Sequence, residues 1–391
     1  MTTRSVQLLR VVHARPGVTR AEASRVLGIG TGAATELVSR LQAAGLVGER
    51  PAAPSGSRGR PTTALVAHPS GPLVAAASIT HENWQVDAVE LGGRVVSSLS
   101  GEHRGGDPAP VLAAVRAAVD RLGPRVRGVG VAMTGPVSRD QRAEASGLGW
   151  HDLDLRPLRS GAQVFVAGND AMLAGAAESS RGAAAGATVA LHVRIAAGLG
   201  GAIVSSGRVV TGAIGAAGEF GHLPFGDPSR PCSCGASGCW GNEVDGNALA
   251  RLLGRPAPPD PIAYARRVIT AAGAPPEQPA GTPVEPPAGP VEPPVGTPAE
   301  RVAVDTVARA LGRGVAGLVN GLDPDLVTIG GLGVELLAAA PDAVHEAYVA
   351  GLMRFRRASA PPVVAAALGD DGPIVGAAEE AWSALLETLP A

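Results

Sequence analysis

All three cysteines of this 391-residue chain stand within eight positions, in the segment CSCGASGC at 232–239. Cysteines crowded in this way do not form a disulfide framework, which needs partners distributed through the fold. Cysteines grouped at short intervals are typical of a metal site in a reduced protein. The segment therefore predicts a metal-binding loop and, with it, a cytoplasmic location.

Length and composition set the frame around this loop. A chain of 391 residues suffices for two or three domains, and 45% hydrophobic with 17% charged residues suits a soluble globular protein. No stretch has the character of a signal peptide, and no apolar run approaches 18 residues, so we expect no membrane association.

Charge is divided unevenly along the chain. Residues 1–68 hold nine Arg and three Glu, a net charge of +6, so the remainder of a chain with net charge −2 carries −8. A basic head on an acidic body predicts a nucleic-acid-binding module fused to a second function.

The basic head, residues 1–68, has the pattern of a winged helix-turn-helix. Apolar residues at helical spacing predict a helix over 4–13, and Thr19 with Glu22 forms a capping box for a second helix that ends at Gly28. The turn GIG leads into a third helix, and two short strands around a flexible tip follow as a wing.

Two sets of residues in this head are predicted to contact double-stranded DNA. The tip Arg58-Gly59-Arg60 is slim and cationic, which suits the minor groove or the phosphates, although a solvated arginine-rich loop is the plain alternative. The third helix would enter the major groove, with Arg contacts to phosphate supplying much of the affinity. A small three-helix module that binds protein is the other alternative. The expected contacts on this helix are Thr31, Gly32, Ala33, Thr35 and Arg40.

The body reads as a duplicated α/β fold. Hairpins followed by strand–helix units occur twice, which predicts a first lobe over 71–187 and a second over 188–373, with a cleft between them. We expect a last helix over 374–389 to pack back on the first lobe. Repeated Pro-Val-Glu-Pro-Pro units predict a disordered insertion over 273–299, to which we assign no chemistry.

Four motifs in the body and one in the head resemble the ROK family of repressors, open reading frames and kinases. They are GND (168–170), AGEFGH (217–222), CSCGASGCW (232–240), DPDLVTIGG (323–331) and GRP (59–61). The resemblance covers nearly the whole chain outside the Pro-rich insertion. It implies a two-lobed actin- and hexokinase-like (ribonuclease H-like) domain with a sugar pocket, preceded in regulators by a winged helix.

The resemblance also implies roles for individual residues. In a family kinase the aspartate of the Asn-Asp pair is the general base, which here is Asp170 beside Asn169; a helix cap is the alternative role for this pair. Glu219 falls where the family places a sugar-hydroxyl acceptor. His222 falls where it places a zinc ligand, so His222, Cys232, Cys234 and Cys239 would hold a structural zinc ion.

Three departures from the family pattern argue against phosphoryl transfer and ordinary hexose binding. The kinase DxGxT turn is SITHE (78–82) here, and the second phosphate turn is AAGLGGA (196–202), so both cradles for phosphate are altered and Asp170 would be a vestigial base. Gly241 stands where the family has a sugar-binding glutamate, and Glu243 is the candidate to replace it.

These features together predict a ROK-type transcriptional regulator, with repression the expected mode. The degenerate kinase domain would sense a sugar-like effector through Asn169, Asp170, Glu219, His222 and Glu243, or would serve as a dimerisation scaffold. We expect a homodimer or homotetramer on a palindromic operator. The alternatives are an ATP-dependent sugar kinase with a DNA-binding appendage and a regulator controlled by a partner protein.

Overall fold

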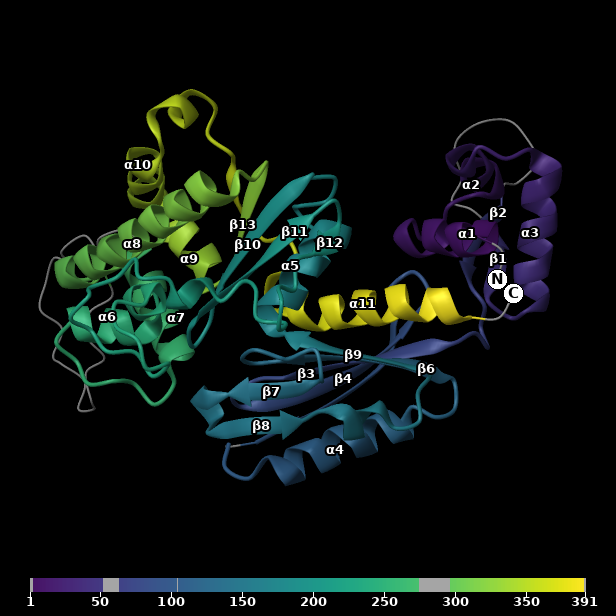
Figure 1. Cartoon of the computed structure of the whole chain (residues 1–391), viewed down its shortest axis with the longest axis horizontal. Coiled ribbons are helices and arrows are strands. Elements are labelled where there is room, and N and C mark those ends of the chain that lie inside the picture. Colours follow the sequence, from purple (N-terminus) through teal and green to yellow (C-terminus); the bar gives the residue numbers. More distant parts are fainter. Residues whose placement is uncertain (1–2, 52–62, 104, 274–295, 390–391) are drawn as a thin grey trace, which may run out of the picture. The chain divides into compact units, whose positions relative to one another are not determined.

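The computed structural model describes residues 3–51, 63–103, 105–273 and 296–389, which fall into two compact units (Figure 1). The wing tip Arg58-Gly59-Arg60 and most of the Pro-rich segment 273–299 lie outside the described residues. Unit 1 is Met1–Arg181, Thr211–Ala216 and Asp371–Ala391, and unit 2 is Gly182–Val210 and Ala217–Asp370.

Unit 1 opens with the predicted winged helix-turn-helix. Thr19 accepts a hydrogen bond from the Glu22 N–H at 3.2 Å and its own N–H donates to the Glu22 carboxylate at 2.8 Å, so the capping box is confirmed. Gly28, at φ 61°, ends the second helix. The elements are α1 (Thr3–Ala14), α2 (Arg20–Leu27), α3 (Thr31–Ala43) and the antiparallel strands β1 (Val47–Pro51) and β2 (Thr63–Ala67).

The rest of unit 1, which we call lobe I, is built on a five-stranded sheet in the order β5-β4-β3-β6-β9. The first three strands form an antiparallel meander, and β6 and β9 continue from β3 in parallel. The strands are β3 (Leu73–Ile79), β4 (Asn83–Glu90), β5 (Val95–Glu102), β6 (Val126–Met133) and β9 (Val164–Asn169), with a separate pair β7 (Arg142–Ala145) and β8 (Trp150–Asp154).

Alternation along β3 gives this sheet two apolar faces. Ala75, Ala77 and Ile79 belong to the core beneath α4 (Pro108–Arg121), whereas Val74 and Ala76 belong to the core that includes α11 (Gly372–Thr388). Figure 1 shows these helices on opposite faces of the sheet. The helix predicted over 374–389 is therefore α11, and it packs with lobe I and with α5 (Asp170–Arg181).

Unit 2 repeats the lobe I sheet topology. Its sheet has the order β12-β11-β10-β13-β14, with an antiparallel meander followed by two parallel strands. The strands are β10 (Val189–Ile195), β11 (Leu199–Ser205), β12 (Arg208–Val209), β13 (Leu326–Gly331) and β14 (Val363–Ala365). The helices are α6 (Gly246–Leu252), α7 (Pro261–Gly273), α8 (Pro298–Leu322), α9 (Leu332–Ala339) and α10 (Pro341–Gly351).

Candidate functional site

Helix α3 presents the predicted DNA-contacting residues on one exposed face. Its inner face buries Ala34, Leu37, Val38 and Leu41 in the winged-helix core. Every predicted contact on this helix is exposed: Thr31, Gly32, Ala33, Thr35 and Arg40.

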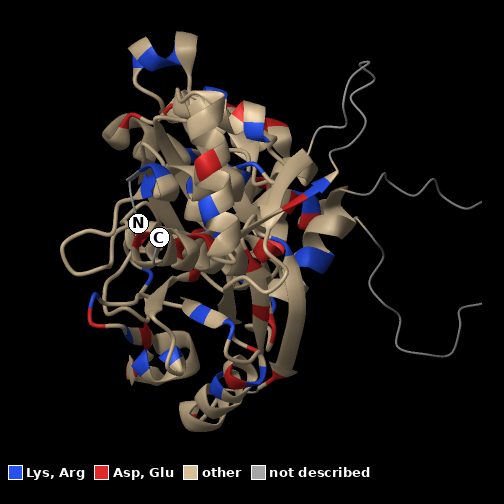
Figure 2. Ribbon diagram, turned by 90° about the vertical axis from the view of Figure 1, so that its right-hand side faces the viewer, with Lys and Arg blue, Asp and Glu red and all other residues tan. Residues whose placement is uncertain are grey.

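The charges around this face are arranged in local pairs. Arg40 forms an exposed i,i+4 ion pair with Glu36 at 2.9 Å, and Arg20 pairs with Glu49 of β1. Exposed pairs of this kind contribute little to stability and exchange readily for a phosphate. In Figure 2 basic and acidic positions are interspersed along the described ribbon.

In lobe I, Asn169 and Asp170 stand at the junction of β9 and α5. The Asn169 side chain accepts from the Met172 N–H at 3.1 Å and donates to the Gly135 carbonyl at 3.1 Å, while Asp170 accepts from the Ala171 N–H at 2.8 Å. Asn169 therefore caps α5 through the N–H of the third helical residue, which is the alternative role that the sequence offered for the pair. Capping holds the Asn169 side chain at the end of the sheet.

The altered turn between β3 and β4 is closed by its own side chain. Thr80 accepts from the N–H groups of Glu82 and Asn83 at 3.3 and 3.2 Å, and its hydroxyl lies 3.1 Å from the Asn83 carbonyl. The N–H groups of Glu82 and Asn83 are therefore directed at the Thr80 hydroxyl within the turn.

His81, in the same turn, is a residue that the sequence analysis did not single out. A Cβ placed on Gly147 would lie 2.8 Å from His81 Nε2, so the imidazole occupies the space in front of that glycine. Burial lowers the pKa of His81, and the charge of Asp170 opposes the shift. The sequence shows a histidine within SITHE (78–82), and this was the signal available for His81. Its contact with Gly147 could not be predicted from the sequence.

In unit 2 the four predicted metal ligands come together. The ligand atoms of His222, Cys232, Cys234 and Cys239 all lie within 4.8 Å of one another. Cys234 Sγ lies 3.6 Å from Cys239 Sγ, and Cys232 Sγ lies 3.8 Å from His222 Nδ1. A tetrahedral zinc ion with Zn–S bonds of about 2.3 Å requires sulfur–sulfur edges of about 3.8 Å, so the donor set fits zinc.

Backbone hydrogen bonds and two glycines shape this loop. The Cys232 N–H donates to Ala236 at 2.8 Å and the Gly235 N–H donates back to Cys232 at 3.0 Å. Gly235 and Gly238 have φ of 91° and 77°, which side-chain-bearing residues rarely adopt. Burial raises the pKa of the Cys239 thiol to about 12, so this thiol would lose its proton only on binding a cation.

Glu219 lies on the side of His222 away from the cysteines. Glu219 Oε2 is 3.9 Å from His222 Nε2, while His222 Nδ1 faces Cys232. The glycines of this motif are set by close packing, because a Cβ on Gly218 would lie 2.2 Å from the Gly201 carbonyl and one on Gly221 would lie 2.1 Å from the Leu199 carbonyl. A rigid loop on β11 therefore positions Glu219 beside the ligand set.

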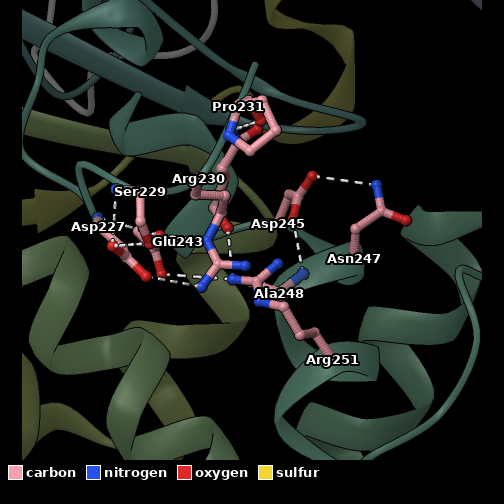
Figure 3. A network of polar contacts seen from close by, with 10 residues as sticks. Asp227, Ser229, Arg230, Pro231, Glu243, Asp245, Asn247, Ala248 and Arg251 are labelled. Atoms are coloured by element: carbon pink, nitrogen blue, oxygen red, sulfur yellow. Dashed lines mark hydrogen bonds and ion pairs between the residues drawn. The ribbon is translucent and has the colours of Figure 1, made fainter. Parts of the chain in front are cut away.

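Glu243, the predicted substitute for the missing sugar-binding glutamate, is held by two guanidinium groups (Figure 3). Its Oε1 accepts from Arg230 Nε at 2.9 Å and its Oε2 lies 3.3 Å from Arg251 Nη2. Its role as an effector ligand stays a prediction, and such a ligand would have to compete with these ion pairs. Gly241 leaves little room, since a Cβ there would lie 3.3 Å from the Gly221 carbonyl.

Trp240 anchors the end of the cysteine loop to unit 2. Its side chain is fully buried and its Nε1 donates to the Ala310 carbonyl of α8 at 3.0 Å. A Cβ on Gly314 would lie 2.0 Å from the indole, so α8 needs glycine there. The predicted site residues are thus divided between units, with Asn169 and Asp170 in unit 1 and Glu219, His222 and Glu243 in unit 2.

Comparison with known proteins identifies the family. The family model described as "ROK family" matches residues 106–382. The chain is 30% identical to a glucokinase of Streptomyces coelicolor over 284 residues, which is 70% of this chain and 86% of that protein. The chain belongs to the ROK family.

The N-terminal part has its own match. A model described as "MarR family" matches residues 1–59, which confirms the winged helix ahead of the ROK domain. The chain is also 28% identical to a putative xylose repressor of Caldicellulosiruptor sp. over 213 residues, covering 52% of this chain and 50% of that protein.

Two solved structures show the fold. A ROK family transcriptional regulator, a homologue of the E. coli MLC protein, aligns with a TM-score of 0.73 at 21% identity and covers 98% of this chain and 97% of its own. A ROK family glucokinase from Streptomyces griseus aligns with a TM-score of 0.64 at 24% identity, covering 80% of this chain and 99% of its own. None of the helices in the described part of the chain combines the length and apolar character needed to span a bilayer.

Proposed function

We infer that this ROK protein is a DNA-binding transcriptional regulator, and we propose that it acts as a repressor in the cytoplasm. The observation that carries the inference is the exposed face of α3 within a winged helix fused to a ROK domain. Relatives named as a putative xylose repressor and a xylose repressor support the same conclusion. A homodimer or homotetramer would place two such helices in half-sites one helical turn, roughly 34 Å, or a multiple apart.

DNA binding is tested with operator duplexes selected from a random pool by the full-length chain. Arg40→Ala and the pair Arg58→Ala with Arg60→Ala should weaken binding and reduce its salt dependence, because each removes a contact to phosphate or groove. Arg116→Ala is the control, since Arg116 is exposed on α4 within lobe I. Unchanged affinity and salt slope in both test variants would overturn the proposed DNA contacts.

We further propose that the ROK domain binds a sugar or sugar derivative as effector. In unit 1, Asn169 and Asp170 supply the donors and acceptors that a polyol requires, and in unit 2 Glu219 and His222 are separate candidates for the same role. Similar proteins named for glucose, xylose and N-acetylmannosamine support this ligand class. Calorimetry with D-glucose, D-xylose and N-acetylmannosamine tests it. Binding should be lost in Asn169→Ala if unit 1 holds the sugar and in Glu219→Ala if unit 2 holds it; no binding would favour a scaffold role.

The metal proposed for the loop is zinc, with a structural role. His222, Cys232, Cys234 and Cys239 would hold the ion, and four protein ligands leave no open position for catalysis. The ion would brace the loop that carries Glu219. Metal analysis of the purified chain should give about one zinc, and Cys239→Ser should lower that content, whereas Ser237→Ala in the same loop should not.

A sugar kinase is the second candidate function, because similar proteins include glucokinases. Asp170 is present as a possible base, but the Thr80-closed turn and the imidazole of His81 stand in the segment that corresponds to a phosphate cradle. We propose that the chain has lost phosphoryl transfer. ATP-dependent phosphorylation of any sugar in the panel, abolished by Asp170→Asn, would contradict this.

A further inference from the structure

Three side chains from three elements meet where the winged helix lies against lobe I. They are His13 near the end of α1, Arg181 at the end of α5 and Glu379 in α11. Arg181 Nε donates to Glu379 Oε1 at 2.6 Å, and His13 Nε2 lies 3.2 Å from Glu379 Oε2. Their side chains are only 9%, 19% and 12% exposed, so this charged group is largely removed from water.

Backbone groups also bond to members of this cluster, His13, Arg181 and Glu379, which together we call the His13 joint. The Gly92 N–H donates to His13 Nδ1 at 3.0 Å, and His13 Nε2 lies 3.1 Å from Arg181 Nη2 as well as 3.2 Å from Glu379 Oε2. Arg181 also donates to the His13 carbonyl at 3.2 Å and to the Gly92 carbonyl at 3.3 Å. One guanidinium therefore bonds to α1, to the β4–β5 turn and to α11 at once.

Burial and pairing act in opposite directions on Glu379. Burial alone would raise the pKa of this carboxyl, but hydrogen bonds and charges from His13 and Arg181 outweigh burial and lower it. Glu379 is therefore an ionised group inside an apolar surround, and it depends on its partners to remain so.

The surround is a single apolar core shared by the winged helix and lobe I. It contains Leu8, Leu9 and Val12 of α1 together with Val89 of β4 and Trp382 of α11. The Trp382 ring lies 5.5 Å from the His13 ring. Because the two parts share one core, the joint is part of the folded unit 1 and holds α1 in place.

The opposite end of α5 carries the proposed effector residues. Asp170 is the first residue of this helix and Arg181 is its last, so 12 residues, about 18 Å of helix, separate them. Close packing ties α5 to α11, because a Cβ on Gly376 would lie 1.9 Å from the Leu173 carbonyl. Helices in backbone contact cannot slide independently, so a displacement of the first turn is transmitted along the pair.

We propose that α5 couples the effector site to the DNA-binding domain, with Arg181 as the positioning residue that transmits the change. This inference rests on the proposed function, since it requires a regulator whose ligand binds at Asn169 and Asp170. A ligand that draws Asn169 away from its bonds to Met172 and Gly135 shifts the first turn of α5. The shift reaches Arg181, alters its bonds to α1 and reorients the winged helix.

The first test needs no effector. Amide hydrogen exchange is measured on the full-length chain for the α1 peptide, residues 3–14, and Asn169→Ala serves as the perturbation at the far end of α5. Exchange of α1 should accelerate by about five-fold or more, in the range of typical coupling between sites. In a chain that already carries Arg181→Gln, Asn169→Ala should not accelerate α1 exchange further, because the connection from α5 to α1 through Arg181 is already lost.

Controls separate this route from general loosening. Arg116→Gln, an exposed arginine of the same unit, should leave the response of α1 to Asn169→Ala intact. Arg181→Lys keeps the charge and one bond, so it should fold and retain part of the response, and it replaces Arg181→Gln if that variant does not fold. Unchanged α1 exchange in Asn169→Ala, or additive effects of the two changes, would overturn the proposal.

The second test uses D-glucose, D-xylose and N-acetylmannosamine with the same chain. A sugar that binds should change α1 exchange in the unsubstituted chain and not in Arg181→Gln, although its affinity stays similar. An equal change in both chains would overturn the role of Arg181. If none of the sugars binds, the proposed effector class fails, and the Asn169→Ala result still decides the coupling.

Discussion

Two buried histidines, one in each unit, show how differently the same side chain can be used. His13 in unit 1 and His192 in unit 2 are 7% and 2% exposed. His13 has both ring nitrogens engaged, with the Gly92 N–H on one and Glu379 on the other. His192 contacts Thr328 Oγ1 at 2.9 Å through Nδ1, and its Nε2 has no hydrogen-bond partner among the described residues.

The difference lies in what each ring connects. His13 joins three elements distant in sequence, α1, the β4–β5 turn and α11. Its loss removes the acceptor of the Gly92 N–H and one of the partners of Glu379, which keeps its bond to Arg181. His192 belongs to β10 and pairs in register with Thr328 of the adjacent strand β13, so its ring connects only neighbouring strands of one sheet. The ring with both nitrogens bonded therefore lies where α1 meets lobe I, and the ring with only Nδ1 bonded among the described residues lies within the unit 2 sheet.

The largest expected effect is from His13→Leu. Leucine keeps the apolar volume but leaves Glu379 and the Gly92 N–H short of a partner. Losing a hydrogen bond to a buried charge and orphaning a donor should destabilise unit 1 by about 3–4 kcal/mol. Calorimetry should show the unit 1 transition lowered by roughly 10 °C. A loss under about 1 kcal/mol would mean that this joint is not held by its polar bonds.

Acid should act on unit 2 through His192. Burial lowers the pKa of His192 to about 3, whereas the unfolded chain binds this proton near pH 6.5. The stability that His192 contributes is therefore complete above pH 6.5 and is lost as the pH falls toward 3. The loss should approach 1.4 kcal/mol per pH unit, or about 3 kcal/mol at pH 4.

The acid prediction is measured by denaturant unfolding of unit 2 between pH 8 and pH 4. His192→Leu is the matched control, because it removes the titrating ring and should flatten that part of the slope. An equal slope in both chains would assign the acid sensitivity to other groups.

Gly92→Ala tests the backbone side of the His13 joint. Gly92 has φ 95°, and alanine in this region costs about 1–2 kcal/mol. Gly123→Ala is the control, since Gly123 has φ 84° with open space around its Cβ position. Both should lose stability, but only Gly92→Ala should accelerate hydrogen exchange in α1. Equal exchange in the two variants would show that the Gly92 bond does not hold the winged helix.

The smallest expected effect is from His192→Leu at pH 8. The Thr328 hydroxyl keeps its bond to the Leu191 carbonyl at 3.3 Å, so no polar group is left alone. Replacing a neutral buried ring by an apolar group of similar size should change stability by about 1 kcal/mol or less. A loss as large as that of His13→Leu would remove the distinction drawn between the two histidines.

Local patterns were predicted well from the sequence because the physics behind them is local. The Thr19–Glu22 capping box is confirmed because it depends on four consecutive residues. The cysteine cluster is similar, since three of its four ligands lie within eight positions and the fourth is ten residues away. The exposed face of α3 followed from helical periodicity alone.

Contacts between distant segments were not predicted. His81 meets Gly147, 66 positions further along the chain, within lobe I. His13 looked like an ordinary residue in the last turn of a helix. Nothing near these positions in the sequence reports the partner, because each partner arrives on a different element.

The sequence by itself determined the winged helix, the duplicated α/β body and the set of side chains for a metal, since caps, periodicity and close spacing act over a few residues. Only the tertiary structure decided which polar residues bond between elements that are distant in the sequence. His13, Arg181 and Glu379 are separated by 168 and 198 positions, and they meet because a shared apolar core folds α1, α5 and α11 together. Because that core excludes water, these buried polar and charged groups are stable only when they bond to one another.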